Sequence, residues 1–219
     1  MYRLAPFEKL LLAFFIFICL LICCRIYYSG SLLFIFLVWN IFLAWIPFTI
    51  SYYLNKPLTG NGWKGGLLFA VWLLFFPNAL YIITDLVHLQ IDTSVPKWFD
   101  AILLFTSSIV GLMMAFISLY RVERFLAKKV DAKRIPVIIA AILFLSSFGV
   151  YLGRFLRWNS WDIIRNPLNL LSAIIQRFIF PLEHLRTWGV TLTLTILFYL
   201  LYISIKKLPG YLSQAGIKN

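Results

Sequence analysis

Charged residues are scarce in this sequence. They make up 13% of its 219 residues, only eight of them are Asp or Glu, and only two residues are His. Soluble globular domains carry about 25% charged residues, which keep their surfaces hydrated. This shortage, with a hydrophobic content of 62% and a mean hydropathy of +0.90, excludes an ordinary soluble domain and favours a protein that is solvated by lipid.

Cysteine is also rare. Cys19, Cys23 and Cys24 all lie in the first apolar segment, and no His or carboxylate accompanies them. A zinc site needs such ligands, and a disulfide framework needs cysteines that are spread along the chain. We therefore interpret the three cysteines as small packing residues.

The sequence lacks the local motifs that identify the commonest catalytic sites. It contains no HExxH pair, no P-loop and no nucleophile elbow. Its net charge of +12 is typical of a nucleic-acid-binding protein, but the basic residues cluster at the ends of apolar segments. Attraction to anionic lipid headgroups explains that distribution better, so we expect no nucleic-acid partner.

Long apolar runs dominate what is present. Each contains about twenty residues, enough to cross a hydrocarbon core of about 30 Å. The runs predict six transmembrane helices, at residues 10–28, 32–54, 66–84, 98–120, 135–153 and 187–205. No internal repeat stands out. We expect an all-α, polytopic membrane helix bundle that forms a single transmembrane domain over residues 1–219.

A further helix of a different kind is predicted between the fifth and sixth spans. Asn166 and Pro167 are typical of a helix start, with Asn166 as the cap and Pro167 at the first helical position. Apolar residues then recur at 168, 171, 174, 175 and 178, whereas Asn169, Ser172 and Gln176 fall on the other side. This pattern predicts an interfacial or re-entrant amphipathic helix that Pro181 ends.

The distribution of Lys and Arg predicts the orientation. Most of these residues, including six in the loop 121–134, lie on the side of the membrane that holds both termini. The positive-inside rule therefore places both termini in the cytoplasm. Arginines such as Arg154 and Arg165 lie on the opposite side and weaken this bias, but a functional outer face would also contribute them.

Two polar stretches end on the same face of the membrane. The third and fifth spans must end on one side, whichever way the chain is inserted. On a continuous α-helix, the polar residues after Pro77 form a stripe about 80° wide. A second stripe follows if residues 151–165 are helical. The candidate polar cluster consists of Asn78, Tyr81, Asp85, His88, Asp92, Arg154, Arg157, Trp158, Asn159, Trp161 and Asp162.

Each of these features also has a purely structural interpretation. Asn78 could satisfy a carbonyl that Pro77 leaves free, and Asp85 with His88 could be the first solvated residues past a span. The tryptophans and arginines after Tyr151 resemble an interfacial aromatic belt.

For the remaining charged residues near a span we expect three different environments. Arg25 is expected to snorkel to the surface, and Asp100 to be a plain interfacial carboxylate. Arg154, the deepest of its group, should be paired with Asp85 or Asp162.

Three strings carry a resemblance to a known family: FPNALYIITDLVHL, VPKWFDAILLF and YLGRFLRWNSWDIIRNP. With them, residues 30–205 resemble the bacterial integral-membrane family known as domain of unknown function 1361. The one small departure is Leu80, where a second proline is expected after Asn-Ala. The resemblance implies a multi-pass protein of the bacterial cell membrane, and it implies no catalytic role for any residue.

Functions of different classes remain open. In the first, the polar residues form a structural network, and the protein is a scaffold or a partner of another membrane protein. In the second, Asp85, His88 and Asp162 bind a divalent cation or act as acid and base, while Arg154 and Arg157 hold an anionic lipid headgroup or phosphate. Transport of a small solute is a third possibility. Membrane lipids are expected partners in all three.

Overall fold

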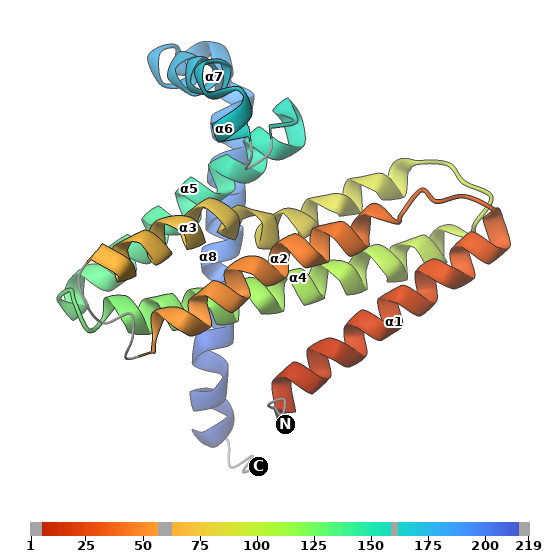
Figure 1. Cartoon of the computed structure of the whole chain (residues 1–219), viewed down its shortest axis with the longest axis horizontal. Coiled ribbons are helices and arrows are strands. Elements are labelled where there is room, and N and C mark those ends of the chain that lie inside the picture. Colours follow the sequence, from red (N-terminus) through yellow and green to blue (C-terminus); the bar gives the residue numbers. More distant parts are fainter. Residues whose placement is uncertain (1–5, 57–62, 159–161, 215–219) are drawn as a thin grey trace. The chain divides into compact units, whose positions relative to one another are not determined.

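The computed structural model describes residues 6–56, 63–158 and 162–214, and every regular element in them is helical (Figure 1). Six helical stretches are long and apolar enough to cross a bilayer, which confirms the all-α helix bundle. The chain divides into two compact units, residues 1–125 and 126–219, which are described one after the other.

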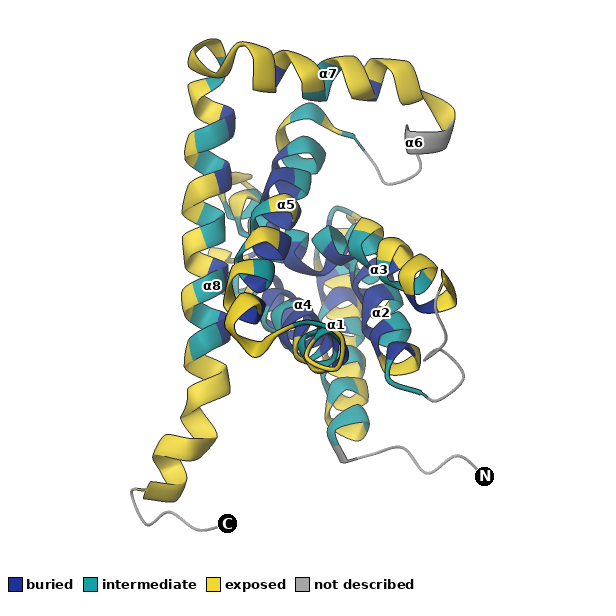
Figure 2. Ribbon diagram, turned by 90° about the vertical axis from the view of Figure 1, so that its left-hand side faces the viewer, coloured by how far each residue is buried: buried dark blue, intermediate teal, exposed yellow. Residues whose placement is uncertain are grey.

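The first unit holds four long helices. They are α1 (Pro6–Ser29), α2 (Phe36–Leu54), α3 (Trp63–Tyr81) and α4 (Lys97–Leu126), and a 3-10 helix, η2 (Ile82–Gln90), continues α3 directly. Burial is concentrated on α2, α3 and α4 (Figure 2). The apolar core of α4 is formed by Leu103, Leu104, Val110, Met114, Ala115 and Leu119.

Small polar side chains connect three of these helices. Trp72 on α3 donates its indole N–H to the hydroxyl of Ser118 on α4, at 2.7 Å. Ser118 in turn donates to the carbonyl of Pro47 on α2, at 3.0 Å. All three residues are buried, so the chain of hydrogen bonds satisfies groups that water cannot reach.

Gly111 allows α4 to approach the end of α3 closely. A Cβ atom at this position would lie 2.9 Å from Cδ1 of Ile82 and 3.0 Å from the carbonyl oxygen of Ala79. One of these neighbours is backbone and cannot move aside. The close approach therefore requires glycine, and it brings Ser108 within 3.2 Å of the Ile82 carbonyl, to which it donates.

The first helix is less closely attached than the other three. Figure 1 shows α1 joined to α2 at its C-terminal end and separating from it toward the N-terminus. Only 17% of its most apolar window is buried, against 67% for α4. The three cysteines of α1 are free thiols, and Cys23 and Cys24 are exposed.

The second unit is built on a helix pair with a crossing helix. Its elements are η3 (Ala132–Arg134), α5 (Ile135–Leu156), α6 (Asp162–Arg165), α7 (Pro167–Ile179), η4 (Pro181–His184) and α8 (Leu185–Gln214). An aromatic cluster connects α5, α7 and α8. The indole of Trp188 on α8 lies against Phe144 and Phe148 of α5 and Phe178 of α7, at 6.3, 5.9 and 5.0 Å between ring centroids.

The helix α7 agrees with the predicted amphipathic segment. It lies crosswise to α8 (Figure 2), begins with Pro167 at its first position and ends at Ile179, two residues before Pro181. Leu168, Leu171 and Ile175 of its apolar stripe are exposed. Asn166 precedes the helix but makes no side-chain capping hydrogen bond.

Two long helices extend beyond the predicted spans. We expected the fourth and sixth spans to end at Tyr120 and Ile205, whereas α4 continues to Leu126 and α8 to Gln214. The reason is that hydropathy marks the apolar part of a helix, and charged residues such as Arg121 or Lys206 do not stop helical hydrogen bonding.

Candidate polar site

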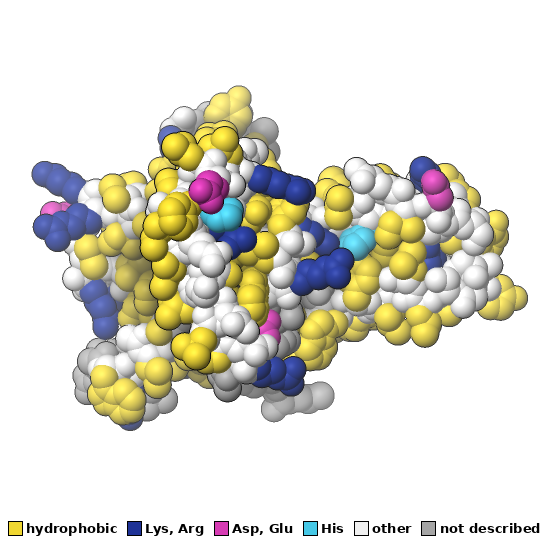
Figure 3. Space-filling model, turned by 90° about the horizontal axis from the view of Figure 1, so that it is seen from above, with side chains coloured by type: hydrophobic (Ala, Val, Ile, Leu, Met, Phe, Trp, Pro, Cys, Tyr) yellow, Lys and Arg dark blue, Asp and Glu magenta, His cyan; other side chains and the backbone are white. Residues whose placement is uncertain are grey.

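Charged side chains are few on the face of the molecule that Figure 3 shows. Hydrophobic side chains cover much of this face, with scattered Lys and Arg and few acidic side chains. Several of the charged groups that the sequence places near segment ends are instead buried, and two clusters in the first unit contain them.

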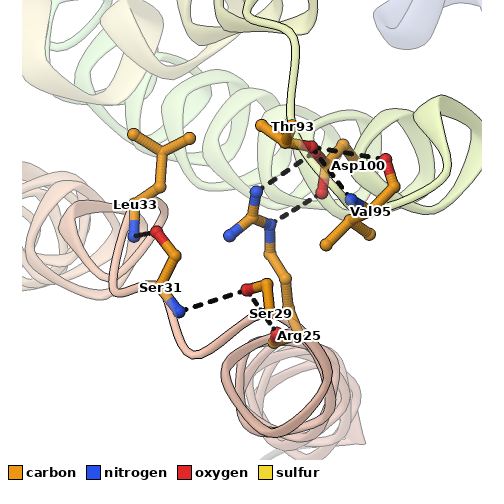
Figure 4. Close-up of polar contacts among 7 residues, drawn as sticks. All are labelled: Arg25, Ser29, Ser31, Leu33, Thr93, Val95 and Asp100. Atoms are coloured by element: carbon orange, nitrogen blue, oxygen red, sulfur yellow. Dashed lines mark hydrogen bonds and ion pairs between the residues drawn. The ribbon is translucent and has the colours of Figure 1, made fainter.

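The first cluster is a buried ion pair between α1 and α4. Arg25 donates from Nε to Oδ1 of Asp100 at 2.8 Å and from Nη2 to Oδ2 at 3.3 Å, as Figure 4 shows. Thr93 adds a hydroxyl hydrogen bond to Oδ2 at 3.1 Å. The guanidinium also lies over the ring of Phe34, 4.4 Å from its centroid. The carboxylate therefore has three donors, and the cation a bidentate partner and an aromatic face.

This geometry corrects two predictions. Arg25 does not snorkel, because only 2% of it is exposed, and Asp100 is not an interfacial carboxylate, because only 3% of it is exposed. Arg25 lies four residues before the end of α1 and Asp100 lies in the first turn of α4, and at these buried positions a lone charge would be costly. Pairing removes most of that cost, so both charges can be buried.

The second cluster contains two of the predicted site residues. Asp85 on η2 is buried and accepts a hydrogen bond of 2.8 Å from the side-chain amide of Asn40 on α2. His88 follows three residues later, with Nε2 4.0 Å from Oδ1 of Asp85 and 29% of its side chain exposed. The imidazole also packs on Phe36, with 5.1 Å between ring centroids. A buried carboxylate thus lies behind a histidine with one accessible side.

The expected α-helical stripe does not continue to Asp92. The α-helix ends at Tyr81, and the next nine residues form a 3-10 helix. The β-branched run Ile82-Ile83-Thr84 disfavours an α-helix, and Thr84 donates its hydroxyl to the Tyr81 carbonyl at 2.6 Å. In a 3-10 helix residues three apart eclipse, so Asp85 and His88 share one face.

Asp92 lies beyond this helix and is separate from the cluster. Its side chain is 90% exposed and pairs with Lys97 across 2.9 Å. The hydrogen bond from Lys97, and then its positive charge, lower the pKa of the Asp92 carboxyl below its ordinary value. Asn78 and Tyr81, the other members of the predicted stripe, are half-buried in the last turns of α3, where Asn78 donates its amide to the Phe75 carbonyl at 3.1 Å.

The second polar stretch is not one helix, as the second stripe required. The helix α5 ends at Leu156, and Arg157 adopts the left-handed conformation with φ 61°. The N–H of Trp158 then reaches back to the Leu152 carbonyl at 3.1 Å, and a left-handed residue just after the last turn is a common way for a helix to end. The next helix that the structure describes, α6, begins at Asp162.

The structure places the residues of this stretch individually. Arg154 is half-buried in the last turn of α5, Arg157 is exposed, and Trp158 and Asp162 are half-buried. Asn159 and Trp161 lie outside the described residues. The pairing of Arg154 with Asp85 or Asp162 stays a prediction.

The described part of the chain contains no group of three or more His, Cys, Asp or Glu side chains that could hold a metal ion. Asp85 and His88 provide two such groups. A cation bound by Asp85, His88 and Asp162 therefore stays a prediction.

Sequence reasoning missed Arg25, Asn40 and Asp100 as members of polar clusters. The signal was available, since the first span ends and the fourth begins on one side of the membrane, as do the start of the second and the end of the third. The third and fifth spans end on one side for the same reason of parity. Parity therefore also predicts that Arg25 lies on the same side as Asp100, and Asn40 on the same side as Asp85. Parity does not predict that residues 82–90 form the 3-10 helix in which Asp85 is buried.

Comparison with known proteins agrees with the resemblance seen in the sequence. Residues 39–201 match the model of the family described as "Protein of unknown function (DUF1361)". No curated protein and no solved structure gives a significant match. The matched segment contains Asn40, Asp85, His88 and Asp100, whereas Arg25 and the rest of α1 precede it. Because the match covers well over half of the chain, this protein belongs to the DUF1361 family.

Proposed function

We propose that the chain is a multi-pass integral protein of a bacterial cell membrane, with both termini in the cytoplasm. Its six long apolar helices support membrane insertion. The excess of Lys and Arg on the side of the termini supports the orientation.

Within that membrane, the protein acts as a structural or partner-binding component. The observation that carries this proposal is that two buried carboxylates, Asp85 and Asp100, bind neighbouring helices together. Asp100 accepts hydrogen bonds from Arg25 and Thr93, and Asp85 accepts one from Asn40. In lipid an unsatisfied polar group costs several kcal/mol, so such contacts fix one arrangement of helices. The exposed apolar surfaces are left for lipid and for another membrane protein.

The experiment measures the stability and the membrane yield of single variants. Asp85→Asn and Asp100→Asn should both lower the melting temperature of the purified protein in detergent and its yield in membranes. Arg157→Gln, at an exposed position outside both clusters, is the matched control and should leave both unchanged. Retained stability in the two Asp variants would contradict the structural role.

A second candidate function is a ligand or acid–base site at Asp85 and His88, together with Arg154 and Asp162. The observation that favours it is the partly exposed His88 imidazole, with the buried Asp85 carboxylate behind it, because carboxylates often orient a functional histidine. Zinc or manganese added to the purified protein should then raise its melting temperature, and His88→Gln should abolish the rise. If neither ion changes the melting temperature, the proposal that this site binds a metal is wrong.

Proximity of the two polar stretches can be tested directly. Single cysteines at 85 and at 154 or 162, in a chain whose Cys19, Cys23 and Cys24 are replaced, should crosslink in membranes and react with an impermeant thiol reagent from outside. Labelling without crosslinking would separate the two stretches and end the composite-site hypothesis.

A further inference from the structure

A groove of about 1030 Å³ lies between α1 and the neighbouring helices α2 and α4. Its walls are mostly aliphatic and aromatic, with Phe15 on one side and Trp39, Phe42 and Trp45 on the other. Pockets for small molecules measure about 300–1,000 Å³, so the groove is large enough for a long hydrocarbon chain. The two helices that supply most of its lining, α1 and α2, separate from each other toward the N-terminus of α1 in Figure 1.

Charged residues lie at one end of this apolar groove. Its lining there includes Glu8 near the start of α1 and Arg121 near the end of α4. Arg121 donates from Nη1 to the Phe48 carbonyl at 3.2 Å and lies over the Phe48 ring, 4.5 Å from its centroid. Lys56 lies nearby over Tyr52, another lining residue, at 4.5 Å. One carboxylate and two cations therefore meet where α1 begins and α2 and α4 end.

We propose that this groove binds an acyl chain of a phosphatidylethanolamine-class lipid, with its phosphate at Arg121 and Lys56 and its ammonium group at Glu8. The apolar walls match the hydrocarbon. The guanidinium suits phosphate oxygens, and the carboxylate suits a primary ammonium donor. A purely anionic lipid such as phosphatidylglycerol would bring a net negative charge beside the Glu8 carboxylate, which an ethanolamine ammonium group would offset. This inference rests on the membrane insertion proposed above, but not on the polar clusters.

The test measures the choice between two lipids. The full-length protein is first shown to float with phosphatidylcholine vesicles, which checks insertion separately. It is then purified in mild detergent and offered equal amounts of phosphatidylethanolamine and phosphatidylglycerol, and the bound lipid is counted by native mass spectrometry. Wild type should retain the ethanolamine lipid preferentially. Glu8→Gln should reduce that preference by about tenfold, the effect of losing one charge-assisted hydrogen bond.

Four further variants test the headgroup contacts and the groove separately. Arg121→Gln should weaken the binding of both lipids, and Lys56→Gln should do the same if the Arg121 variant does not fold. Leu11→Trp places bulk in the groove and should abolish binding, whereas Leu10→Trp, which is exposed and does not line the groove, should leave it unchanged.

Three results would overturn the proposal. Equal retention of both lipids by the wild type would remove the role of the ammonium group, and equal binding by the two Trp variants would remove the groove. A dimer in lipid-free detergent that Leu11→Trp dissociates would show that a second copy of the chain occupies it. Failure to float would instead contradict membrane insertion.

Discussion

Two ion pairs in the first unit have nearly equal lengths and very different surroundings. Arg25 and Asp100 approach to 2.8 Å with side chains 1% and 5% exposed, and Lys97 and Asp92 approach to 2.9 Å with side chains 66% and 90% exposed. In water the attraction is weak and salt screens it, whereas away from water an unpaired charge is strongly disfavoured. Distance alone therefore does not show which pair matters for the fold.

The largest expected effect is at the buried pair. Asp100→Ala leaves the Arg25 guanidinium without its acidic partner, and removing one member of a buried pair destabilises a protein by about 3–5 kcal/mol. Circular dichroism during denaturation in detergent should show this loss. The double variant Arg25→Met/Asp100→Leu should recover most of it, because an apolar pair of similar volume needs no compensation. If the double variant is as unstable as Asp100→Ala, the ion pair itself stabilises the fold, and the loss in Asp100→Ala is not caused only by an unpaired charge.

An intermediate effect is expected at Asn40. Asn40→Ala removes the amide that donates to the buried Asp85 carboxylate. Cross-helix hydrogen bonds in membranes contribute about 0.6–1.7 kcal/mol, and a charged acceptor places this one toward the upper end. The same denaturation measurement applies. Asn169→Ala, on the exposed side of α7, is the matched control and should be neutral.

Close packing beside the buried clusters gives a comparable test. Gly111→Ala introduces the Cβ that meets Ile82 and the Ala79 carbonyl, and overpacking of this kind costs about 1–3 kcal/mol. Gly189→Ala on α8, which meets nothing within 4 Å, should instead be neutral or slightly stabilising because Ala favours a helix. Equal effects of the two substitutions would show that α4 and η2 can move apart freely.

The smallest effect belongs to the exposed pair, and it depends on pH. Because Lys97 lowers the pKa of Asp92 in the folded chain, the pair stabilises the fold above the ordinary Asp pKa of about 3.9. That contribution is lost as the pH falls through the lowered value. Melting curves of Asp92→Asn should differ slightly from wild type at pH 7 and coincide at low pH, and 1 M salt should remove the difference. If Asp92→Asn lowered the stability as much as Asp100→Ala, the exposed pair would matter as much for the fold as the buried pair, and the comparison would be wrong.

The sequence is a good guide to this fold where hydropathy and helix-start chemistry decide the outcome. Six apolar runs predicted six long helices, and Pro167 predicted the start of α7. It is a poor guide where a local backbone change redirects side chains. Left-handed residues at helix ends are usually glycine, but the residue that ends α5 in this conformation is Arg157. The 3-10 helix after Tyr81 also contacts α4, where Ser108 donates a hydrogen bond to the Ile82 carbonyl.

The candidate site was predicted less completely, for a physical reason. Sequence patterns place Asp85 and His88 on one face correctly, because residues three apart share a face in both kinds of helix. They do not show that a neighbouring helix supplies the Asn40 amide, nor that Arg25 and Asp100 meet. Such contacts depend on tertiary packing between residues that lie 45 and 75 positions apart in the chain.

That separation of 75 residues also has a consequence for biosynthesis. At about 5–20 residues per second, a ribosome needs roughly 4–15 s to reach Asp100 after it has added Arg25. If the chain inserts into a membrane as we propose, the cation of α1 lacks its Asp100 partner during this interval and is expected to keep its charge near the headgroups, as long basic side chains do. Snorkelling, wrong as a description of the finished protein, would then describe the nascent chain until α4 brings Asp100 to Arg25.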